Sequence, residues 1–339
     1  MSFQTDKYEI DFFNVKNADA ILIRCFNGMI PYIILIDAGN TNDSEIIKNH
    51  LKDYYDNSTI DLAICTHPDK DHIGGFFNLL NDDNISISEF WLIDPAAHLS
   101  ADDLKYYRNE ESAREAVRKV FNHPNDPQQN LIEILTSKNG IKALTIKEGC
   151  SHEEIPIKVL APTTEYYSEI VKDMVEGYVE PYDEPDTEAY DENALPDDDD
   201  AKSVIDEVDD DSPFNAGSIV LLFEPGDGNQ FLFTGDANCA SLSQMIEKHD
   251  DELNNIEILK VPHHGSKHNI TTEIIEKLKP KYSIISAKGT KKHPNSGLVH
   301  WLSKYGDVYS THKTTKLRYH KNINRPNTSA AIPLRKKSN

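Results

Sequence analysis

Short apolar runs that end in polar residues recur along the chain. Residues 8–24 alternate roughly between apolar and polar positions, which predicts paired strands at the edge of a sheet. Residues 32–37 and 60–65 are rich in aliphatic side chains and short, as expected for buried strands. Between them, residues 43–55 place apolar side chains at helical spacing. Strands therefore alternate with amphipathic helices, and the pattern predicts an α/β fold with α+β character.

The same pattern continues further along the chain. Residues 100–121 are expected to form one capped helix, because Ser100 precedes a first turn with two acidic residues. Residues 226–228 predict a hairpin turn between two apolar runs. Further strands are expected at 89–93, 143–146, 157–160, 219–223, 231–233 and 256–261.

An acidic stretch interrupts this alternation. After a helix expected at 166–175, residues 176–211 are rich in Asp, Glu and Pro, which predicts an extended, mobile insertion. One interpretation is a solvating loop. The alternative is an acidic segment, residues 176–210, that binds a protein partner or folds over the basic C-terminal third and masks it.

The domain organisation follows from these patterns. We expect one domain over residues 1–339, divided into a first half (1–162), the acidic insertion (163–213), a second half (214–325) and a basic tail (326–339).

Composition limits the class of protein. A chain of 339 residues with 38% hydrophobic content can bury a core, and its apolar runs are too short to span a bilayer. We therefore expect a soluble, cytoplasmic protein that does not interact with membranes. The four cysteines are widely spaced and form no C-x-x-C pair, which argues against a disulfide framework or a thiolate zinc site.

Charge is distributed unevenly along the chain. The formal net charge is −22, but residues 165–211 contain 20 acidic and 2 basic residues, whereas residues 257–339 contain 17 basic and 4 acidic residues. The C-terminal third therefore carries the positive field that favours a phosphate-bearing substrate.

The densest chemistry follows the apolar run 60–65. His67, Asp69, Asp71 and His72 form an H-x-D-x-D-H array on the loop at the end of this strand. A tight loop can direct such alternating ligands toward two cation positions. The alternative is that the two aspartates cap the following helix and the histidines are ordinary loop residues.

Polar residues follow three other apolar runs. Asp37 precedes Ala and Gly, Asp236 ends the motif Thr-Gly-Asp, and His263 and His264 begin a His-His-Gly-Ser turn that includes Ser266. Side chains at strand ends are common in active sites. Asp37 could equally accept hydrogen bonds from loop amides, and the two roles are compatible.

The order of these motifs resembles that of metallo-β-lactamase-fold hydrolases. Asp69 stands where the usual H-x-H-x-D-H array has its middle histidine, which is similar to the branch containing the nuclease-like domain of ComEC-type DNA-uptake proteins. The resemblance covers residues 12–311 outside the acidic insertion, and it implies a four-layer αββα sandwich. Two departures stand out. Residues 16–18 read Lys-Asn-Ala where the branch has Gly-Gln-Gly, and the usual third histidine ligand of the first metal has only Asn215 as a polar substitute.

The resemblance also implies the roles of individual residues. His67 and Asp69 would hold one metal, Asp71, His72 and His263 the other, and Asp236 would bridge both, with Asp37 supporting the ligands. The cofactor would be two divalent metal ions, zinc or manganese, since imidazoles favour zinc and carboxylates favour harder cations. Catalysis would involve Asp71, with His264 and His293 protonating the leaving oxygen or binding the phosphoryl group. Substrate would contact Asn215, Ser266, Lys288, Lys291 and Lys292.

These features predict metal-dependent hydrolysis of phosphodiester bonds by a metal-activated hydroxide, with DNA or RNA as the substrate. One alternative is a small-molecule esterase, lactonase or phosphodiesterase in which the acidic insertion rejects polymers. Another is a regulatory subunit that keeps the fold and is inactive without a partner protein.

Overall fold

The computed structural model describes residues 4–175, 187–193, 196–207, 210–325 and 330–338. Within these ranges the chain forms a seven-stranded sheet, a six-stranded sheet and a two-stranded ribbon. The acidic insertion and the basic tail are therefore only partly covered, and the predictions for residues 176–186, 194–195, 208–209, 326–329 and 339 lie outside the described residues. No helix in the described ranges is both long and apolar enough to cross a bilayer.

The first sheet has the strand order β15-β1-β2-β3-β4-β5-β8. The predicted strands near the N-terminus, β1 and β2, pair with each other as expected, but β15 rather than either of them forms the antiparallel edge; the half from β3 to β8 is parallel. The strand bounds are β1 Tyr8–Phe13, β2 Ala20–Asn27, β3 Ile30–Ala38, β4 Thr59–Ile64, β5 Ser86–Leu92, β8 Lys142–Thr145 and β15 Lys316–Lys321.

The second sheet has the strand order β14-β13-β12-β11-β10-β9. Its strands are β9 Ile157–Ala161, β10 Val220–Phe223, β11 Gln230–Phe233, β12 Ile256–Lys260, β13 Tyr282–Ile285 and β14 Asp307–Ser310, while β6 Asn122–His123 and β7 Asp126–Asn130 form the ribbon. The predicted halves do not coincide with the two sheets. Strand β9, from the first half, pairs with β10, and β15, near the C-terminus, pairs with β1.

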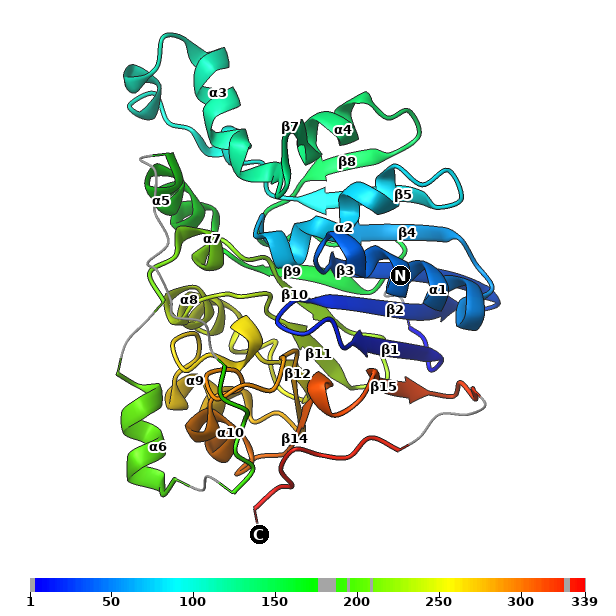
Figure 1. Ribbon diagram of the computed structural model, residues 1–339, viewed down its shortest axis with the longest axis vertical. Helices are drawn as coiled ribbons and strands as arrows, with labels where there is room; N and C mark the ends of the chain where they lie inside the picture. The colour runs from blue at the N-terminus through cyan, green and yellow to red at the C-terminus, as the bar shows by residue number, and fades with distance from the viewer. Residues whose placement is uncertain (1–3, 176–186, 194–195, 208–209, 326–329, 339) are drawn as a thin grey trace.

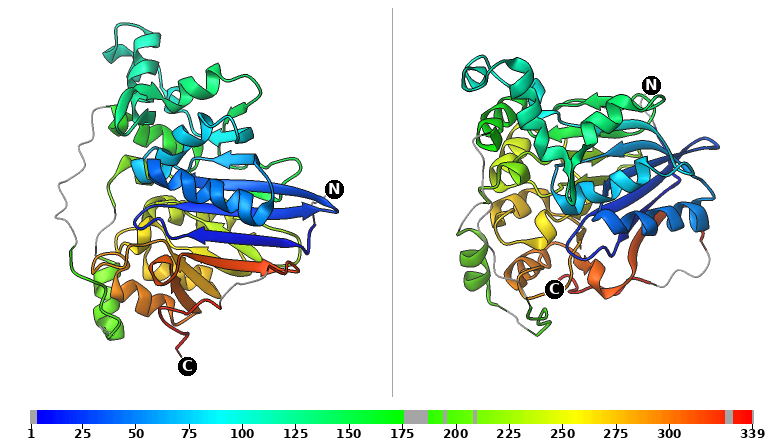
Figure 2. Two further views of the ribbon diagram at one scale, coloured as in Figure 1. Left: turned by 45° about the vertical axis from the view of Figure 1, so that its right-hand side comes forward. Right: turned by 45° about the horizontal axis from the view of Figure 1, so that its top comes forward.

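Helices cover the outer faces of both sheets (Figures 1 and 2). Many begin after a capping side chain; Asn238, Thr271 and Asn295, for example, accept hydrogen bonds from the first turns of α8, α9 and α10. The helix bounds are α1 Ser44–His50, α2 Lys70–Leu80, α3 Glu110–Arg118, α4 Leu131–Ser137, α5 Thr164–Val175, α6 Asp198–Ile205, α7 Pro213–Ala216, α8 Cys239–His249, α9 Thr272–Leu278 and α10 Ser296–Leu302.

Three apolar clusters hold these layers together. One lies between the sheets, where Phe12 of β1 and Phe233 of β11 are both buried. A second packs α2 against the first sheet, and a third packs α8, α9 and α10 against the second sheet. The succession of helix, sheet, sheet and helix layers confirms the predicted four-layer α/β sandwich.

Two local predictions were wrong. Residues 100–121 do not form one helix, because α3 begins only after Asn109, whose side chain caps it, and Asp103–Tyr106 is a separate 3-10 turn. Within the insertion, residues 198–205 form helix α6 rather than an extended segment. Ala201 and Ile205 are buried in the apolar cluster that also contains Trp301 of α10, and this packing outweighs the acidic composition.

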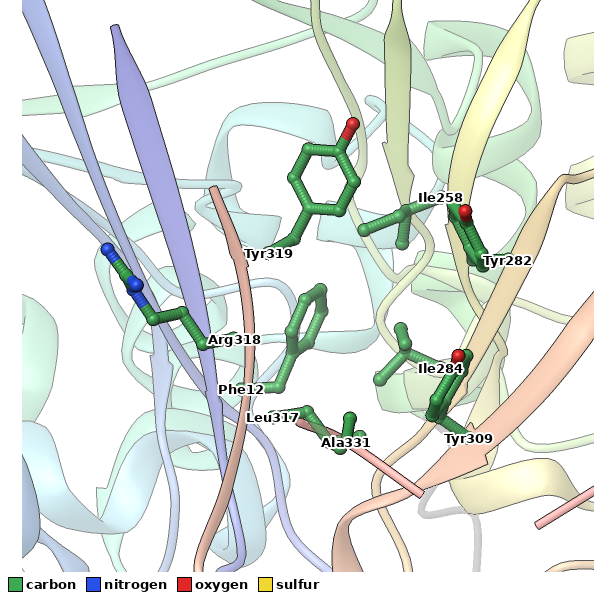
Figure 3. Close-up of a pocket in the computed structure, with 9 residues that line it drawn as sticks. All are labelled: Phe12, Ile258, Tyr282, Ile284, Tyr309, Leu317, Arg318, Tyr319 and Ala331. Carbon is green, nitrogen blue, oxygen red and sulfur yellow. The ribbon is translucent and has the colours of Figure 1, made fainter. Parts of the chain in front are cut away.

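The two sheets leave a pocket of about 180 Å³ at the open edge of the sandwich. Figure 3 shows that Phe12 and Tyr319 approach it from the first sheet and Ile258 and Tyr309 from the second. None of the candidate metal ligands lines this pocket, so it is separate from the site described below.

Candidate metal centre

The predicted strand ends meet at one edge of the sandwich. Strands β3 and β4 end beside Asp37 and the loop of His67, and β11 and β12 end beside Asp236 and the His-His turn. Gly75 allows α2 to press against the end of β3, because a Cβ atom there would lie 2.1 Å from the carbonyl oxygen of Ala38. The loop from His67 to His72, called the ligand loop below, is thereby held against the sheet.

Asp37 orients two histidines of the ligand loop. Its Oδ2 accepts a hydrogen bond from Nδ1 of His72 at 2.8 Å and another from the hydroxyl of Thr66 at 2.7 Å. Because the Thr66 hydroxyl donates to Asp37, it can accept from Nδ1–H of His67, which lies 3.1 Å away. Both histidines therefore carry a proton on Nδ1 and direct Nε2 to the same space.

His264 completes this group from the other half of the chain. Its Nδ1 donates to the carbonyl oxygen of Ser286 at 2.9 Å, which leaves the lone pair on Nε2. That Nε2 lies 3.1 Å from Oδ2 of Asp71 and 3.7 Å from Oδ2 of Asp236. Two acceptors this close require a proton or a metal cation between them.

Three histidines and two aspartates thus form overlapping clusters. The ligand atoms of His67, His72 and Asp236 lie within 4.8 Å of one another, as do those of Asp71, His72 and His264. The Nε2 atoms of His67 and His72 are buried and make no hydrogen bond with the described residues. Buried nitrogens of this kind need a partner. Imidazole and carboxylate donors fit divalent zinc or manganese, so the residues fit the metal that the fold implies.

The carboxylates determine the charge of this group. Burial lowers the pKa of His72, but Asp236 and Asp37 outweigh it and raise that pKa well above its ordinary value. Burial raises the pKa of Asp71, and the hydrogen bond with His264 more than offsets this, so the pKa of Asp71 lies below its usual range. An array of ionised carboxylates that holds protons on histidines is an environment that a divalent cation can occupy by displacing those protons.

A buried lysine lies behind the clusters. Lys260, 1% exposed at the end of β12, forms an ion pair with Asp19 and lies 3.6 Å from Oδ1 of Asp236. It also donates to the carbonyl oxygen of Gly235 at 2.8 Å. Oδ1 of Asp236 therefore faces the lysine, while Oδ2 faces the histidines, 3.3 Å from His72 Nε2.

His263, the second predicted ligand of this turn, lies outside both clusters. Its Nδ1 is 3.1 Å from Oδ2 of Asp210 and 3.0 Å from Oδ1 of Asn269. Burial lowers the pKa of His263, but the hydrogen bond with Asp210 leads the effects that raise it to about 9. The structure thus brings His264, rather than His263, against Asp71, and a metal-binding role for His263 stays a prediction.

The remaining predicted metal and substrate residues lie around these clusters. Asp69 precedes α2 but makes no capping hydrogen bond, and its Oδ2 lies 3.6 Å from His67 Nε2. Asn215 is buried and donates to Asp210 at 2.6 Å. The hydroxyl of Ser266 accepts a hydrogen bond from the amide of His268. The ring of His293 lies 5.7 Å from that of His263 and 6.4 Å from that of His264, between centroids.

The predicted lysines lie on the loop that leads to His293. The backbone amide of Lys288 donates to the Asn17 side chain at 2.7 Å, so this loop contacts the segment that departs from Gly-Gln-Gly. Within that segment Lys16 adopts a positive φ of 67°, the conformation that glycine accommodates most easily. Lys291 and Lys292 are exposed on the same loop, and Lys291 forms an ion pair with Glu188 at 2.7 Å.

Three residues of this region were missed. Lys260 and Asp19 had a signal, since each is a charged residue within or beside an apolar run. Asp210 had none, because it lies in the acidic stretch where neighbouring carboxylates look alike.

Comparisons with known proteins agree with this arrangement. Residues 32–166, which include the loop from His67 to His72, match the sequence profile of the Metallo-beta-lactamase superfamily. ComE operon protein 3 of Bacillus subtilis (strain 168) is 32% identical over 129 residues, and this alignment covers 35% of the chain and 15% of that protein. The chain therefore spans only a small part of this relative's length.

Two of the solved structures that are similar to this chain share little sequence identity with it. The metallo-beta-lactamase fold protein YhfI from Bacillus subtilis has 9% identity and a TM-score of 0.45, with coverage of 92% of this chain and 99% of that chain. Igni18, a metallo hydrolase from Ignicoccus hospitalis, has 13% identity and a TM-score of 0.42, with coverage of 92% and 98%. From the profile match over residues 32–166 and the four-layer architecture we conclude that this chain has the metallo-β-lactamase fold.

Proposed function

We propose that the protein is a metal-dependent hydrolase of phosphodiester bonds and that its substrate is DNA or RNA. The observation that carries this proposal is the convergence of three Nε2 atoms, from His67, His72 and His264, on Asp71 and Asp236. A pair of divalent ions held there, zinc or manganese, would supply a Lewis acid and lower the pKa of water.

The chain's own residues would prepare the site for this chemistry. Asp37 holds His67, through Thr66, and His72 in one tautomer, so their nitrogens need not reorient. His293, whose ring lies near those of His263 and His264, would give a proton to a leaving oxygen.

A polyanionic substrate is favoured by the basic loop beside the site. Lys288, Lys291 and Lys292 lie on the segment that leads to His293, and their charges would attract phosphates that flank the scissile bond. The sequence similarity to ComE operon protein 3 over 129 residues agrees with the resemblance to ComEC-type proteins.

A small-molecule phosphodiesterase is the second candidate, and a specific observation favours it. Glu188, from the acidic insertion, forms an ion pair with Lys291 and places a negative charge where a polymer's phosphates would pass. A small phosphodiester would not need this path.

One set of assays separates these functions. The purified protein, analysed for bound metal, is offered a plasmid, single-stranded RNA and bis(p-nitrophenyl) phosphate with Mn²⁺ or Zn²⁺. We expect cleavage of the polymers and its loss in His72→Ala and Asp236→Asn, but not in the control His320→Ala, an exposed histidine on β15. Cleavage of the small ester alone would support the second candidate. Bound metal without any hydrolysis would refute both and favour a regulatory subunit.

A further inference from the structure

We propose that residues 187–193, the acidic segment, are an intramolecular occupant of the path that a nucleic acid would take to the metal centre. The inference rests on the proposed function. A polyanion would have to displace the acidic segment, whereas a small phosphodiester would not. The segment would therefore lower the affinity for nucleic acid until it is displaced.

The acidic segment is attached to the basic loop by its backbone. Ala189 and Thr290 form an antiparallel β-bridge. The backbone amide of Tyr190 donates a hydrogen bond to the carbonyl oxygen of Gly289 at 3.0 Å. The backbone amide of Lys291 donates one to the carbonyl oxygen of Glu188 at 2.8 Å. These hydrogen bonds set the register of the segment along the loop.

That register places acidic side chains on basic ones. Glu188 forms an ion pair with Lys291 at 2.7 Å, and Glu192 forms one with Lys313. Between them, the ring of Tyr190 lies 6.2 Å from that of His312. The acidic segment thus pairs with two separate lysines of the basic C-terminal third.

The loop beneath the segment belongs to the rim of the metal centre. Only Lys292 separates Lys291 from His293, whose ring lies 5.7 Å from that of His263. The backbone amide of Asn295 donates a hydrogen bond to the carbonyl oxygen of Gly265 at 2.9 Å, which links the loop to the His-His turn. A strand bound at the centre would therefore pass beside the acidic segment.

The strength of the ion pairs fits a displaceable occupant. The side chains of Glu188 and Lys291 are each 69% exposed, and exposed ion pairs are weak because solvent screens them. Phosphates can compete for such lysines with the help of counterion release. The segment can thus weaken polymer binding without closing the site permanently.

Binding of a fluorescein-labelled 20-nucleotide single-stranded DNA tests the inference. Anisotropy is measured over a series of NaCl concentrations for the wild-type chain and for Glu188→Gln/Glu192→Gln. Loss of these two ion pairs should make the plot of log K against log salt steeper by up to about 1.4, since each lysine contributes about 0.7 on a single strand. Affinity at low salt should rise several-fold, while kcat/KM for bis(p-nitrophenyl) phosphate stays unchanged.

Two further variants separate docking from net charge. Tyr190→Pro removes the amide that bonds to Gly289 without changing the charge, and it should also raise DNA affinity. The control Glu111→Gln/Glu115→Gln removes the same charge from exposed positions on α3, at the opposite end of the molecule from β14 (Figure 1), and should have little effect.

The outcomes are distinct from those that test the hydrolase assignment. Unchanged DNA affinity in both segment variants, an equal gain in the control, or no DNA binding by any variant would overturn the inference. Because binding is read without catalysis, loss of the hydrolase proposal would appear separately, as inactivity toward every ester.

Discussion

Replacing Lys260 by methionine would test how the protein supports charge behind its metal centre. The lysine and Asp19 are each 1% exposed and form an ion pair, and Asp236 lies 3.6 Å away on the other side. Burial lowers the pKa of Lys260, but Asp19 and Asp236 outweigh it and raise that pKa, so the side chain is charged at neutral pH. Methionine has a similar volume and no charge, so the variant leaves two buried carboxylates facing an apolar group.

The expected magnitude follows from the burial of the pair. Removing one partner of a buried ion pair costs about 3–5 kcal/mol, because the other charge remains without compensation. Asp19→Asn should cost less than Lys260→Met, since the lysine keeps Asp236 as a partner. The double variant removes both charges, and we expect it to recover about 2 kcal/mol relative to the sum of the single changes.

Urea unfolding followed by tryptophan fluorescence measures these differences, because Trp91 and Trp301 are both buried. Lys281→Met serves as a control, since this lysine is 52% exposed in its ion pair with Glu257 and should matter by less than about 1 kcal/mol. If Lys260→Met lowers the free energy of unfolding by as little as the control does, the reasoning is refuted. Strictly additive single changes would refute the coupling.

Of three further predictions, two concern the metal centre and the third concerns the buried pair of Asp11 and His50. His72→Ala removes a donor shared by both clusters, so metal content measured by mass spectrometry should fall, whereas His320→Ala should retain it. Asp37→Asn weakens the orientation of two histidines and should lower metal affinity about 10- to 100-fold in a chelator competition; unchanged affinity would contradict this role. Burial raises the pKa of Asp11, but the hydrogen bond with His50 leads the effects that lower it from 3.8 to about 2. This lowered pKa contributes about 2 kcal/mol of stability above pH 4, which is lost as the pH falls toward 2. In acid titrations of unfolding stability, Asp11→Asn should lack that component.

The parts of the site that could be predicted from the sequence are those at strand ends. Asp37, the His67 to His72 loop and Asp236 each follow an apolar run, and parallel strands bring such positions to one edge of a sheet. The layer order was predicted from the resemblance to metallo-β-lactamase-fold proteins, and it agrees with the continuous apolar strands, which need cover on both faces. The pairing of β9 with β10 and the pairing of β15 with β1 both cross the halves. Neither has a local signal in the sequence, since each depends on which sheet edge is open.

The orientation of neighbouring side chains in a turn could not be predicted. His263 and His264 both have positive φ, 44° and 54°, so neither the strand nor the helix periodicity tells which one faces the ligand loop. Composition also misled at α6, where Asp198 and its acidic neighbours occupy a helix N-terminus that favours negative charge, and the apolar side chains behind them decide the structure.

The metal centre and the stability of the sandwich are physically linked. Asp71 and His72 come from the first sheet's side, and Asp236 and His264 from the second, so the two clusters that contain Asp236 or His264 span both sheets. Carboxylates brought together across this boundary repel one another, while the apolar core between the sheets holds them in place. Lys260 offsets part of that repulsion, and a bound divalent ion would turn the remainder into attraction. At a free metal concentration of about 1,000 times Kd, binding alone would stabilise the folded chain by about 4 kcal/mol. The same contacts that would position a substrate would then also join the two halves.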